Sequence, residues 1–234
     1  IINLPSKTEI IYDWIDFDKR DNFIDFKSIF GPKHKEMKVF LFLGGIQKTK
    51  GSLEVVKIFN KKIINKDARL LFVGSDLKHN IPKGIKGYLK IILSKFNYLS
   101  YSDKIKKIIR LDERIICIPS TNQVKTLFEQ SYCTIVYPTI PHAIIPIAES
   151  IFLGKPILSA QTPEALEYSN QGEGAKLFKM NDEEEFTNGL IYILNNKELI
   201  NKNAQDNSEF IKKLFSKEKN SNKLNQLYNR ILDS

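Results

Sequence analysis

Cysteine and histidine are scarce in this 234-residue chain, and long apolar runs are absent. The two cysteines, Cys117 and Cys133, lie in strand-like apolar runs, which predicts buried free thiols and a reducing cytoplasm rather than a disulfide framework. No Cys, His, Asp and Glu cluster has metal-ligand spacing, so we expect no metal site, and no serine elbow or Cys–His pair stands out. No apolar run reaches the length of a membrane-spanning helix, so we exclude one.

Arginine is also scarce, although the chain as a whole is basic. The formal net charge of +9 favours a phosphate-bearing ligand, nucleic acid or an anionic membrane face as partner. Only five of the 36 basic residues are arginine, whereas a nucleic-acid reader uses more arginine interleaved with aromatic residues. We therefore expect a small anionic ligand and no nucleic acid, in a cytoplasmic protein with a peripheral contact to the inner membrane face.

The chain divides into a connector, residues 1–22, and a single domain, residues 23–234. In the connector we expect a short strand at Ile10–Tyr12, and residues 13–18 alternate acidic with large apolar side chains that need a surface to pack against. The chain starts at Ile1 with no basic or long apolar segment after it, so we expect a fragment without a signal peptide.

Six apolar runs alternate with helical patterns, which predicts an α/β fold with a doubly wound, Rossmann-like parallel sheet. If the strand order is the usual 3-2-1-4-5-6, the loops after the first and fourth strands meet at a ligand crevice. These loops are residues 44–51 and 138–149. The expected strands are residues 38–43, 69–74, 114–118, 133–137, 155–159 and 175–178.

Helices are expected between these strands and after the last one. The long connection 77–112 predicts one or two helices, and residues 122–130 predict another. In the C-terminal part, Asp182 is placed to start one helix. A final helix is predicted from a stripe of apolar residues that should be buried: Leu224, Leu227, Tyr228 and Ile231.

Three side chains at the expected crevice could carry chemistry. Lys50 follows a glycine pair and is predicted in the first turn of a helix, where the helix start and the ammonium group attract a phosphate; the alternative is a solvated lysine. Glu149 can accept hydrogen bonds from ribose hydroxyls or simply stabilise a helix start. His142 can serve as an acid, a base or a phosphate contact, or be an ordinary loop residue.

Six short segments also occur in an order that is found in one enzyme family. They are residues 12–16 (YDWID), 40–51 (FLFLGGIQKTKG), 70–74 (LLFVG), 137–138 (YP), 141–149 (PHAIIPIAE) and 150–157 (SIFLGKPI). Residues 12–16 resemble the inter-domain YNGVD of a family 4 glycosyltransferase, residues 40–51 its VGRL…EKG loop, and residues 70–74 its second strand. Residues 137–138 resemble the PS after its fourth strand, residues 141–149 its EGFGLPLLE, and residues 150–157 its AMACGKPV. The resemblance covers nearly the whole chain and implies the C-terminal, donor-binding half of a glycosyltransferase-B fold.

The resemblance assigns roles to residues of both loops. Lys50, with Gly44 and Gly45 beside it, would bind the donor diphosphate, and Glu149 would hold the ribose hydroxyls. The backbone of Ala143, Ile144 and Ile145 would approach the phosphate and sugar, and residues 116–119 would line the base pocket. We place catalysis on Lys50 and His142.

The chain departs from the family pattern at four positions. Gly45 stands where the family has an arginine that binds the diphosphate. Pro141 replaces the first glutamate of the paired-glutamate motif, which lies near the transferred sugar. His142 and Ile144 replace two loop glycines, so they should crowd the backbone approach. Donor binding is therefore better supported than the family's usual chemistry.

The expected activity is that of a nucleotide-sugar-dependent hexosyltransferase in polysaccharide biosynthesis. The donor would be a UDP- or GDP-linked sugar with no further cofactor, the acceptor a saccharide or lipid-linked saccharide, and the acceptor half a missing N-terminal domain. The alternative is a catalytically silent module that binds a nucleotide sugar and supports a partner enzyme. Pro141 and Gly45 favour the alternative, and retention of Lys50 and Glu149 counts against it.

Overall fold

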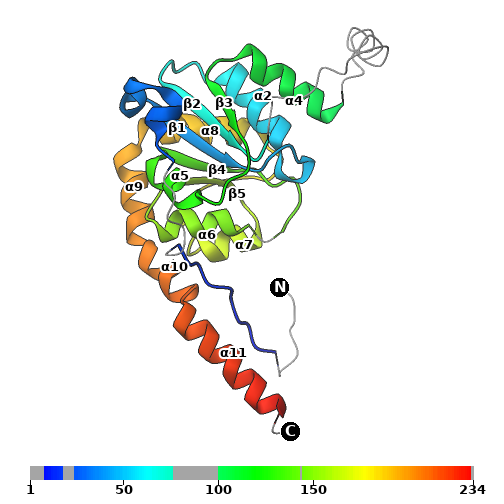
Figure 1. Cartoon of the computed structure of the whole chain (residues 1–234), viewed down its shortest axis with the longest axis vertical. Coiled ribbons are helices and arrows are strands. Elements are labelled where there is room, and N and C mark those ends of the chain that lie inside the picture. Colours follow the sequence, from blue (N-terminus) through cyan, green and yellow to red (C-terminus); the bar gives the residue numbers. More distant parts are fainter. Residues whose placement is uncertain (1–7, 18–23, 76–99, 143, 233–234) are drawn as a thin grey trace.

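A parallel sheet forms the centre of the computed structural model, which describes residues 8–17, 24–75, 100–142 and 144–232 (Figure 1). The strand order is β3-β2-β1-β4-β5-β6, so the predicted order and the Rossmann-like fold are confirmed. All six predicted strands are present, within one or two residues at each end. They are β1 (Lys38–Leu43), β2 (Ala68–Val73), β3 (Ile115–Ile118), β4 (Cys133–Val136), β5 (Ile157–Ala160) and β6 (Lys176–Phe178).

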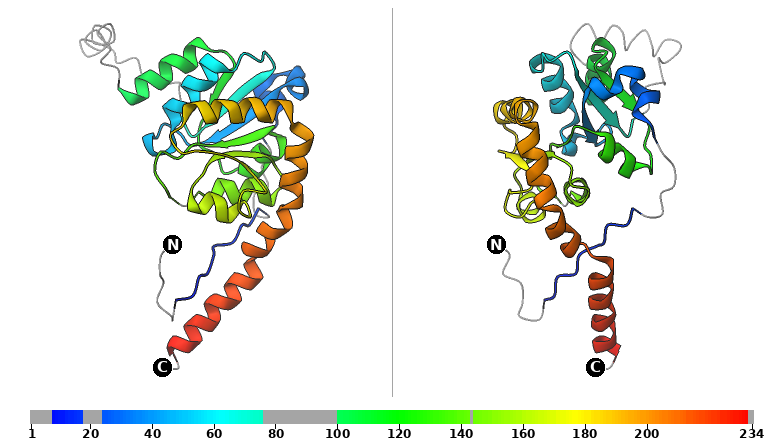
Figure 2. Two further views of the ribbon diagram at one scale, coloured as in Figure 1. Left: turned by 180° about the vertical axis from the view of Figure 1, so that it is seen from behind. Right: turned by 90° about the vertical axis from the view of Figure 1, so that its left-hand side faces the viewer.

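Helices cover both faces of this sheet (Figures 1 and 2). α2, α4 and α8 pack on one face, whereas α1, α5, α6, α7 and α10 pack on the other. The helices are α1 (Phe26–Phe30), α2 (Ser52–Lys62), α4 (Tyr101–Leu111), α5 (Val124–Gln130), α6 (Ile145–Phe152), α7 (Pro163–Tyr168), α8 (Glu183–Asn195), α9 (Lys197–Asp206), α10 (Ser208–Leu214) and α11 (Lys217–Leu232). Two short 3₁₀ helices are η1 (Pro32–Glu36) and η2 (Lys48–Lys50).

β1 is the central strand because both of its faces are apolar. Phe40 and Phe42 pack toward α2, while Val39 and Leu41 pack toward α1 and α5. None of the four is more than 2% exposed. A parallel strand that is covered on both sides needs such a continuous apolar run. β1 pairs with β2 on one edge and with β4 on the other, so the winding of the sheet reverses between β1 and β4, as predicted.

The predicted strand at Ile10–Tyr12 is wrong. Residues 8–17 have no regular secondary structure, because they pack through side chains against helices instead of pairing with a strand. Tyr12 donates a hydrogen bond to the Glu167 carboxylate, and its ring lies 5.6 Å from that of Phe215. The Ile15 amide donates to the Phe215 carbonyl (3.4 Å). The expected need for a packing surface is met by α7 and the end of α10.

The helix predictions hold in part. α4 confirms a helix in the long connection 77–112, of which residues 76–99 lie outside the described part. Asp182 caps α8, accepting hydrogen bonds from the Glu184 and Glu185 amides. The buried stripe on the last helix is wrong: Tyr228 is 56% exposed and Ile231 60% exposed. α11 projects away from the sheet (Figure 2), and residues 8–17 run beside it, with ion pairs from Lys217 to Asp16 and from Arg230 to Glu9.

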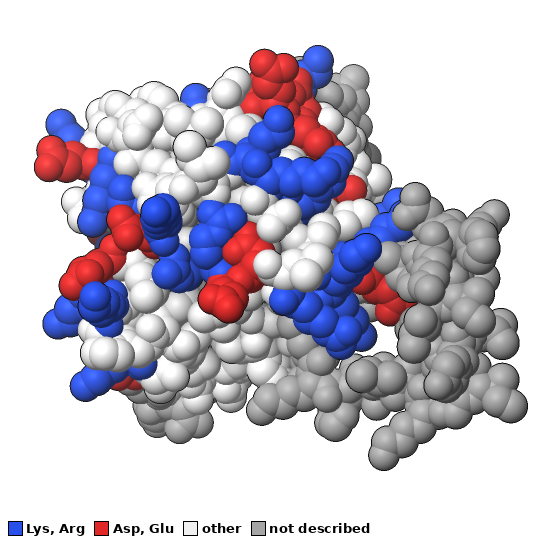
Figure 3. Space-filling model, turned by 90° about the horizontal axis from the view of Figure 1, so that it is seen from above, with Lys and Arg blue, Asp and Glu red and all other residues white. Residues whose placement is uncertain are grey.

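The described surface carries mixed charge. Seen from above, Lys and Arg side chains alternate with Asp and Glu rather than forming one continuous basic face (Figure 3). Within residues 8–17, 24–75, 100–142 and 144–232, no helix has both the length and the apolarity that crossing a membrane requires.

Candidate functional site

The loops after β1 and β4 lie against each other at the carboxyl edge of the sheet. Thr139, which follows β4, donates its amide to the Thr49 carbonyl (2.9 Å) and its hydroxyl to the Lys48 carbonyl (3.1 Å). About ninety positions separate these residues in the sequence, so the predicted meeting of the two loops is confirmed.

The loop after β1 is shaped by a glycine and a buried serine. Gly45 has φ +56°, and a Cβ there would lie 2.8 Å from the Gly74 carbonyl oxygen, so only glycine fits. Ser52 is fully buried, accepts a hydrogen bond from the Gln47 amide (3.0 Å), and places its hydroxyl proton between the Gly45 and Gln47 carbonyls (2.7 and 2.8 Å). The loop is therefore fixed before any ligand arrives.

Lys50 lies in the 3₁₀ turn η2, and not in the first turn of α2 as predicted. The cause is Gly51, whose left-handed backbone (φ +64°) ends the turn and begins α2. A Cβ at Gly51 would lie 2.4 Å from the Tyr137 carbonyl oxygen. The missing side chain thus lets the Lys50 turn approach the end of β4 closely.

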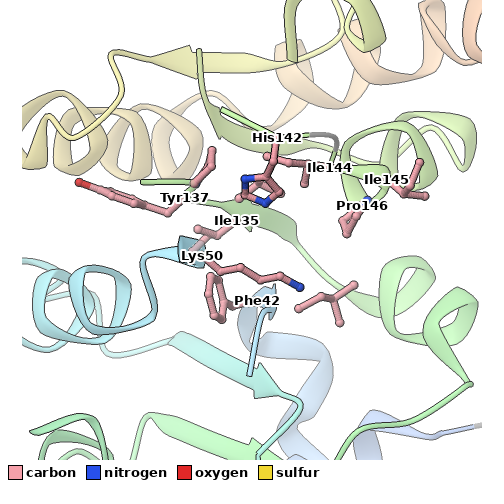
Figure 4. A pocket seen from close by; sticks show the side chains of 11 residues that line it. Phe42, Lys50, Ile135, Tyr137, His142, Ile144, Ile145 and Pro146 are labelled. Atoms are coloured by element: carbon pink, nitrogen blue, oxygen red, sulfur yellow. The ribbon is translucent and has the colours of Figure 1, made fainter. Parts of the chain in front are cut away.

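A pocket of about 240 Å³ opens where the two loops meet, and we call it the His142 pocket. Lys50 enters it from the β1 side, and the ring of His142 lies across from it (Figure 4). Ile144 and Ile145 line it too, so four of the predicted site residues converge here. The remaining lining is apolar or aromatic and comes from Phe42, Leu43, Ile135, Val136, Tyr137, Pro138 and Pro146.

His142 is oriented by its own loop. Its Nδ1 lies 2.9 Å from the Ile140 carbonyl oxygen. Because a carbonyl can only accept, Nδ1 carries the proton and Nε2 is left for a ligand. Ala143, predicted to approach the phosphate, lies outside the described residues.

The first turn of α6 faces the same pocket. Ile144 precedes it and makes no side-chain cap, no acidic residue occupies the first turn, and Pro146 lies within it. Proline suits this position because an amide there would have no partner within the helix. Within the first turn of α6 and its cap, no side chain neutralises the positive end of the helix.

A second pocket, of about 230 Å³, adjoins the first, and we call it the Gly45 pocket. Gly44 and Gly45 line it together with Lys50, which is common to both pockets. Its far wall includes Ser120 and Thr121, which directly follow residues 116–119, the segment expected at a base pocket.

Glu149 lies elsewhere. It lines a third pocket of about 340 Å³, the Glu149 pocket, with Asp13, Trp14 and Asp16 from the connector. This pocket shares Ile145 with the His142 pocket, but Lys50 is not in its lining. The structure therefore brings Lys50 and His142 together and places Glu149 on the other side of Ile145.

The family model described as "Glycosyl transferases group 1" matches residues 24–212. The chain belongs to this glycosyltransferase family. No curated protein matches the sequence.

Solved structures that share this fold include several that are distant in sequence from this glycosyltransferase domain. One is Anabaena Alr3699/HepE in complex with UDP and glucose (TM-score 0.68, 14% identity, 87% of this chain and 50% of that chain). A second is a Rickettsia africae glycosyltransferase (TM-score 0.69, 18% identity, 88% of this chain and 50% of that chain). A third is sucrose-phosphate synthase from Thermosynechococcus elongatus (TM-score 0.62, 17% identity, 88% of this chain and 48% of that chain). These likenesses show a glycosyltransferase-B fold, and the chain spans about half the length of each structure.

Tyr137 supports the glycosyltransferase site through its ring rather than its hydroxyl. The ring packs 5.2 Å from Phe178 and 5.0 Å from Phe186. Burial, and then the negative charge of Glu183, raises the pKa of the Tyr137 hydroxyl to about 12. Because of this raised pKa, the hydroxyl stays neutral at ordinary pH. It also points away from Lys50 and His142 (Figure 4), so it takes no part in the pocket's chemistry.

Several positioning residues were not foreseen from the sequence. Ser52 and Thr139 shape the loops, and the Tyr101 hydroxyl accepts a hydrogen bond from the Leu53 amide (3.0 Å) at the start of α2. The place of Ser52, directly after the glycine-containing loop that follows a strand, is a weak sequence signal for a hydroxyl that bonds to the loop backbone. Nothing in the sequence places Thr139 or Tyr101, whose partners lie far away along the chain. Within the described parts of the chain, no group of three or more His, Cys, Asp and Glu could hold a metal ion.

Proposed function

We propose that this domain binds a UDP- or GDP-linked sugar and transfers a hexose to a saccharide or lipid-linked acceptor, as a family 4 glycosyltransferase would. One observation carries the proposal: Lys50 lies between two adjoining pockets and lines both. A diphosphate is the central, doubly charged part of a nucleotide sugar, so a cation between two pockets suits a ligand with a nucleoside at one end and a sugar at the other.

The two pockets differ in a way that orients this ligand. The Gly45 pocket offers backbone at its three glycines and hydroxyls at Ser120 and Thr121, which suit the polar edge of a base. The sugar then enters the His142 pocket. Among the described residues, none forms an ion pair with Lys50. Its charge is available to a phosphate, where charge-assisted hydrogen bonds are about twice as strong as neutral ones.

Catalysis would rest on stabilising the departing nucleoside diphosphate. Lys50 and the uncapped start of α6 place positive charge where negative charge develops as the glycosidic bond breaks. His142 presents Nε2 to the same pocket, where it can accept the proton of an acceptor hydroxyl or, when charged, donate to a phosphate oxygen. Both roles are proposals that the convergence of these side chains supports.

The ribose role of Glu149 is also a proposal. Its carboxylate lines the pocket beyond Ile145, so a ribose would have to extend past that side chain. Glu149→Ala should weaken binding of UDP but leave binding of 2′,3′-dideoxy-UDP unchanged, because the second ligand lacks the hydroxyls. Equal losses for both ligands, measured by calorimetry, would remove Glu149 from the ribose site.

The acceptor would bind a second half that precedes this chain, since the chain covers about half of the similar structures. α11 extends away from the sheet with the connector beside it (Figure 1), and we propose these two segments as the neighbours of such a half. With a lipid-linked acceptor, we place the enzyme in the cytoplasm at the inner membrane face, where the net charge of +9 favours a peripheral contact.

Calorimetry of this domain with UDP and with GDP tests the proposal. We expect one of them to bind at submillimolar concentration, and no binding of either at millimolar concentration would contradict it. The silent-module alternative is favoured by one observation, that no carboxylate of the described residues lines the His142 pocket. Donor turnover by the full-length protein that is lost in Lys50→Ala supports the enzyme, whereas binding without turnover supports the module.

A further inference from the structure

The His142 pocket is unusually apolar for a place that should hold a sugar. Of its eleven lining residues in the described part of the chain, nine are apolar or aromatic, and the other two, Lys50 and His142, bring polar ends. A monosaccharide that carries a hydroxyl on nearly every carbon normally meets several hydrogen-bonding side chains. The lining therefore bears on which sugar fits.

The backbone of the pocket's floor adds little hydrogen-bonding capacity. Phe42 pairs with Phe72 of β2 and with Ile135 of β4, so the ladder occupies peptide groups at the end of β1. The one further hydroxyl in the lining belongs to Tyr137, and it points away from the pocket (Figure 4). Lys50 is engaged by the diphosphate, which leaves Nε2 of His142 as the side-chain group for the sugar itself.

We propose, resting on the function proposed above, that the donor sugar is a 6-deoxyhexose, in which a methyl group replaces the hydroxymethyl group of an ordinary hexose. The methyl group would contact the apolar wall formed by Val136 and Ile144, which line the pocket and pack in the same cluster beside α6. A hydroxymethyl group at this wall would leave water without gaining a partner, and an unpaired hydroxyl in an apolar site is disfavoured.

The size of the pocket agrees with this assignment. Its volume of about 240 Å³ lies below the range of roughly 300–1,000 Å³ that drug-sized ligands occupy. It accommodates one end of a nucleotide sugar rather than the whole molecule. The nucleoside, with its polar base, is left to the Gly45 pocket on the other side of Lys50.

The test compares donors that share a base and differ at the sixth carbon. If UDP binds, calorimetry is carried out with UDP, UDP-glucose and UDP-6-deoxyglucose; if GDP binds, with GDP, GDP-mannose and its 6-deoxy analogue. We expect the 6-deoxy donor to bind about tenfold more tightly than the hydroxylated one, the ratio that corresponds to about 1.4 kcal/mol. Equal affinity, or tighter binding of the hydroxylated sugar, would overturn the inference while leaving nucleotide-sugar binding intact.

Two further outcomes separate this inference from the proposed function. If neither nucleoside diphosphate binds, the proposed function fails and the inference fails with it. If UDP-N-acetylglucosamine binds more tightly than UDP-6-deoxyglucose, the apolar wall receives an acetamido group, and the 6-deoxyhexose is wrong.

An isosteric variant checks that the wall causes the preference. Val136→Thr places a hydroxyl on the wall at nearly constant volume, and it should lower the tenfold ratio to about threefold or less. Val124→Thr makes the same change in the Gly45 pocket and should shift the affinities of both donors alike, so the ratio stays the same. Thermal melts establish that both variants fold, and an unchanged ratio in folded Val136→Thr would contradict the assignment of the wall.

Discussion

The loops after β1 and β4 face each other across the same crevice, but they are built in different ways. The β1 loop is fixed by Gly45, by Gly51 and by the buried Ser52 with its hydrogen bonds. In the described part of the β4 loop there is no glycine; Thr139 ties it to the turn of Lys50, and His142 bonds only within its own loop. The first loop holds a cation in place, and the second supplies an apolar wall.

This difference indicates that the two halves of the crevice serve separate purposes. The glycines of the β1 loop allow the backbone to approach a ligand closely, and they lie where the diphosphate should bind. The large apolar side chains of the β4 loop lie where the sugar should bind. Anion binding should therefore depend on the β1 loop, and the choice of sugar on the β4 loop.

The largest effect on stability is expected for Gly51→Ala. An alanine at φ +64° costs about 1–2 kcal/mol in backbone strain, and its Cβ would meet the Tyr137 carbonyl at 2.4 Å. Urea denaturation should show a loss of about 3 kcal/mol. Gly154→Ala, at φ +63° with its nearest neighbour the flexible Gln205 side chain at 3.3 Å, is the matched control and should lose only about 1–2 kcal/mol. Equal losses would mean that the two loops do not pack closely.

Ser52→Ala should have the next largest effect. The variant leaves the Gln47 amide and the Gly45 carbonyl without their buried partner, which should lower the free energy of unfolding by about 2 kcal/mol. Nucleoside diphosphate binding should weaken as well, because the loop before Lys50 loosens. Ser221→Ala removes an exposed hydrogen bond to the Glu218 carbonyl and serves as the control, with a change within about 0.5 kcal/mol. A Ser52 variant as stable as this control would contradict the rigid β1 loop.

Thr139→Val should cost less, about 1 kcal/mol, because it removes one partly exposed hydrogen bond to the Lys48 carbonyl and keeps the one from its amide. Thr139→Ser retains the hydroxyl and should restore most of this loss in a thermal melt. If the valine variant were destabilised more than Ser52→Ala, the contrast between the loops would be reversed.

The smallest effect on binding is expected far from both loops, at Asp112. Burial alone would raise the pKa of its carboxyl, but hydrogen bonds from Arg114 and Asn60 outweigh burial and lower it. A carboxyl with a lowered pKa in the folded state stabilises the fold above its unfolded pKa, and this stabilisation is lost as the pH falls through the folded value. Asp112→Asn should therefore flatten the loss of stability below about pH 4 and leave UDP affinity unchanged. A change in UDP affinity would show that the crevice is not independent of this end of the sheet.

The fold could be predicted because each strand is a short, continuous apolar run between turn residues. Burial on both faces imposes that pattern, and the parallel order then brings Lys50 and His142 together. Helix starts follow less directly from the apolar pattern: α6 begins at Ile145 with Pro146 in its first turn, a position that proline tolerates.

The rest of the site depends on contacts that no local pattern contains. Glu149 lines a pocket with Asp13 and Trp14 because the connector packs against α6 from more than a hundred positions away. Helical periodicity identified an apolar stripe on α11 but could not show that its residues Tyr228 and Ile231 would be exposed. Local sequence specifies elements and faces, whereas tertiary packing decides what lies opposite them.

The central claim is that Lys50 binds the diphosphate of the donor. It is tested most directly by comparing the affinities of a nucleoside diphosphate and a monophosphate for the wild type and for lysine variants. UDP and UMP, or GDP and GMP if the guanine nucleotide binds, are titrated by calorimetry into the wild type, Lys50→Ala and Lys48→Ala. We predict that Lys50→Ala weakens diphosphate binding by about tenfold to a hundredfold, as expected for lost charge-assisted hydrogen bonds. It should barely affect the monophosphate, and Lys48→Ala, in the same turn, should leave both affinities nearly unchanged. Equal losses for the two nucleotides in Lys50→Ala, or no loss in either, would contradict the account.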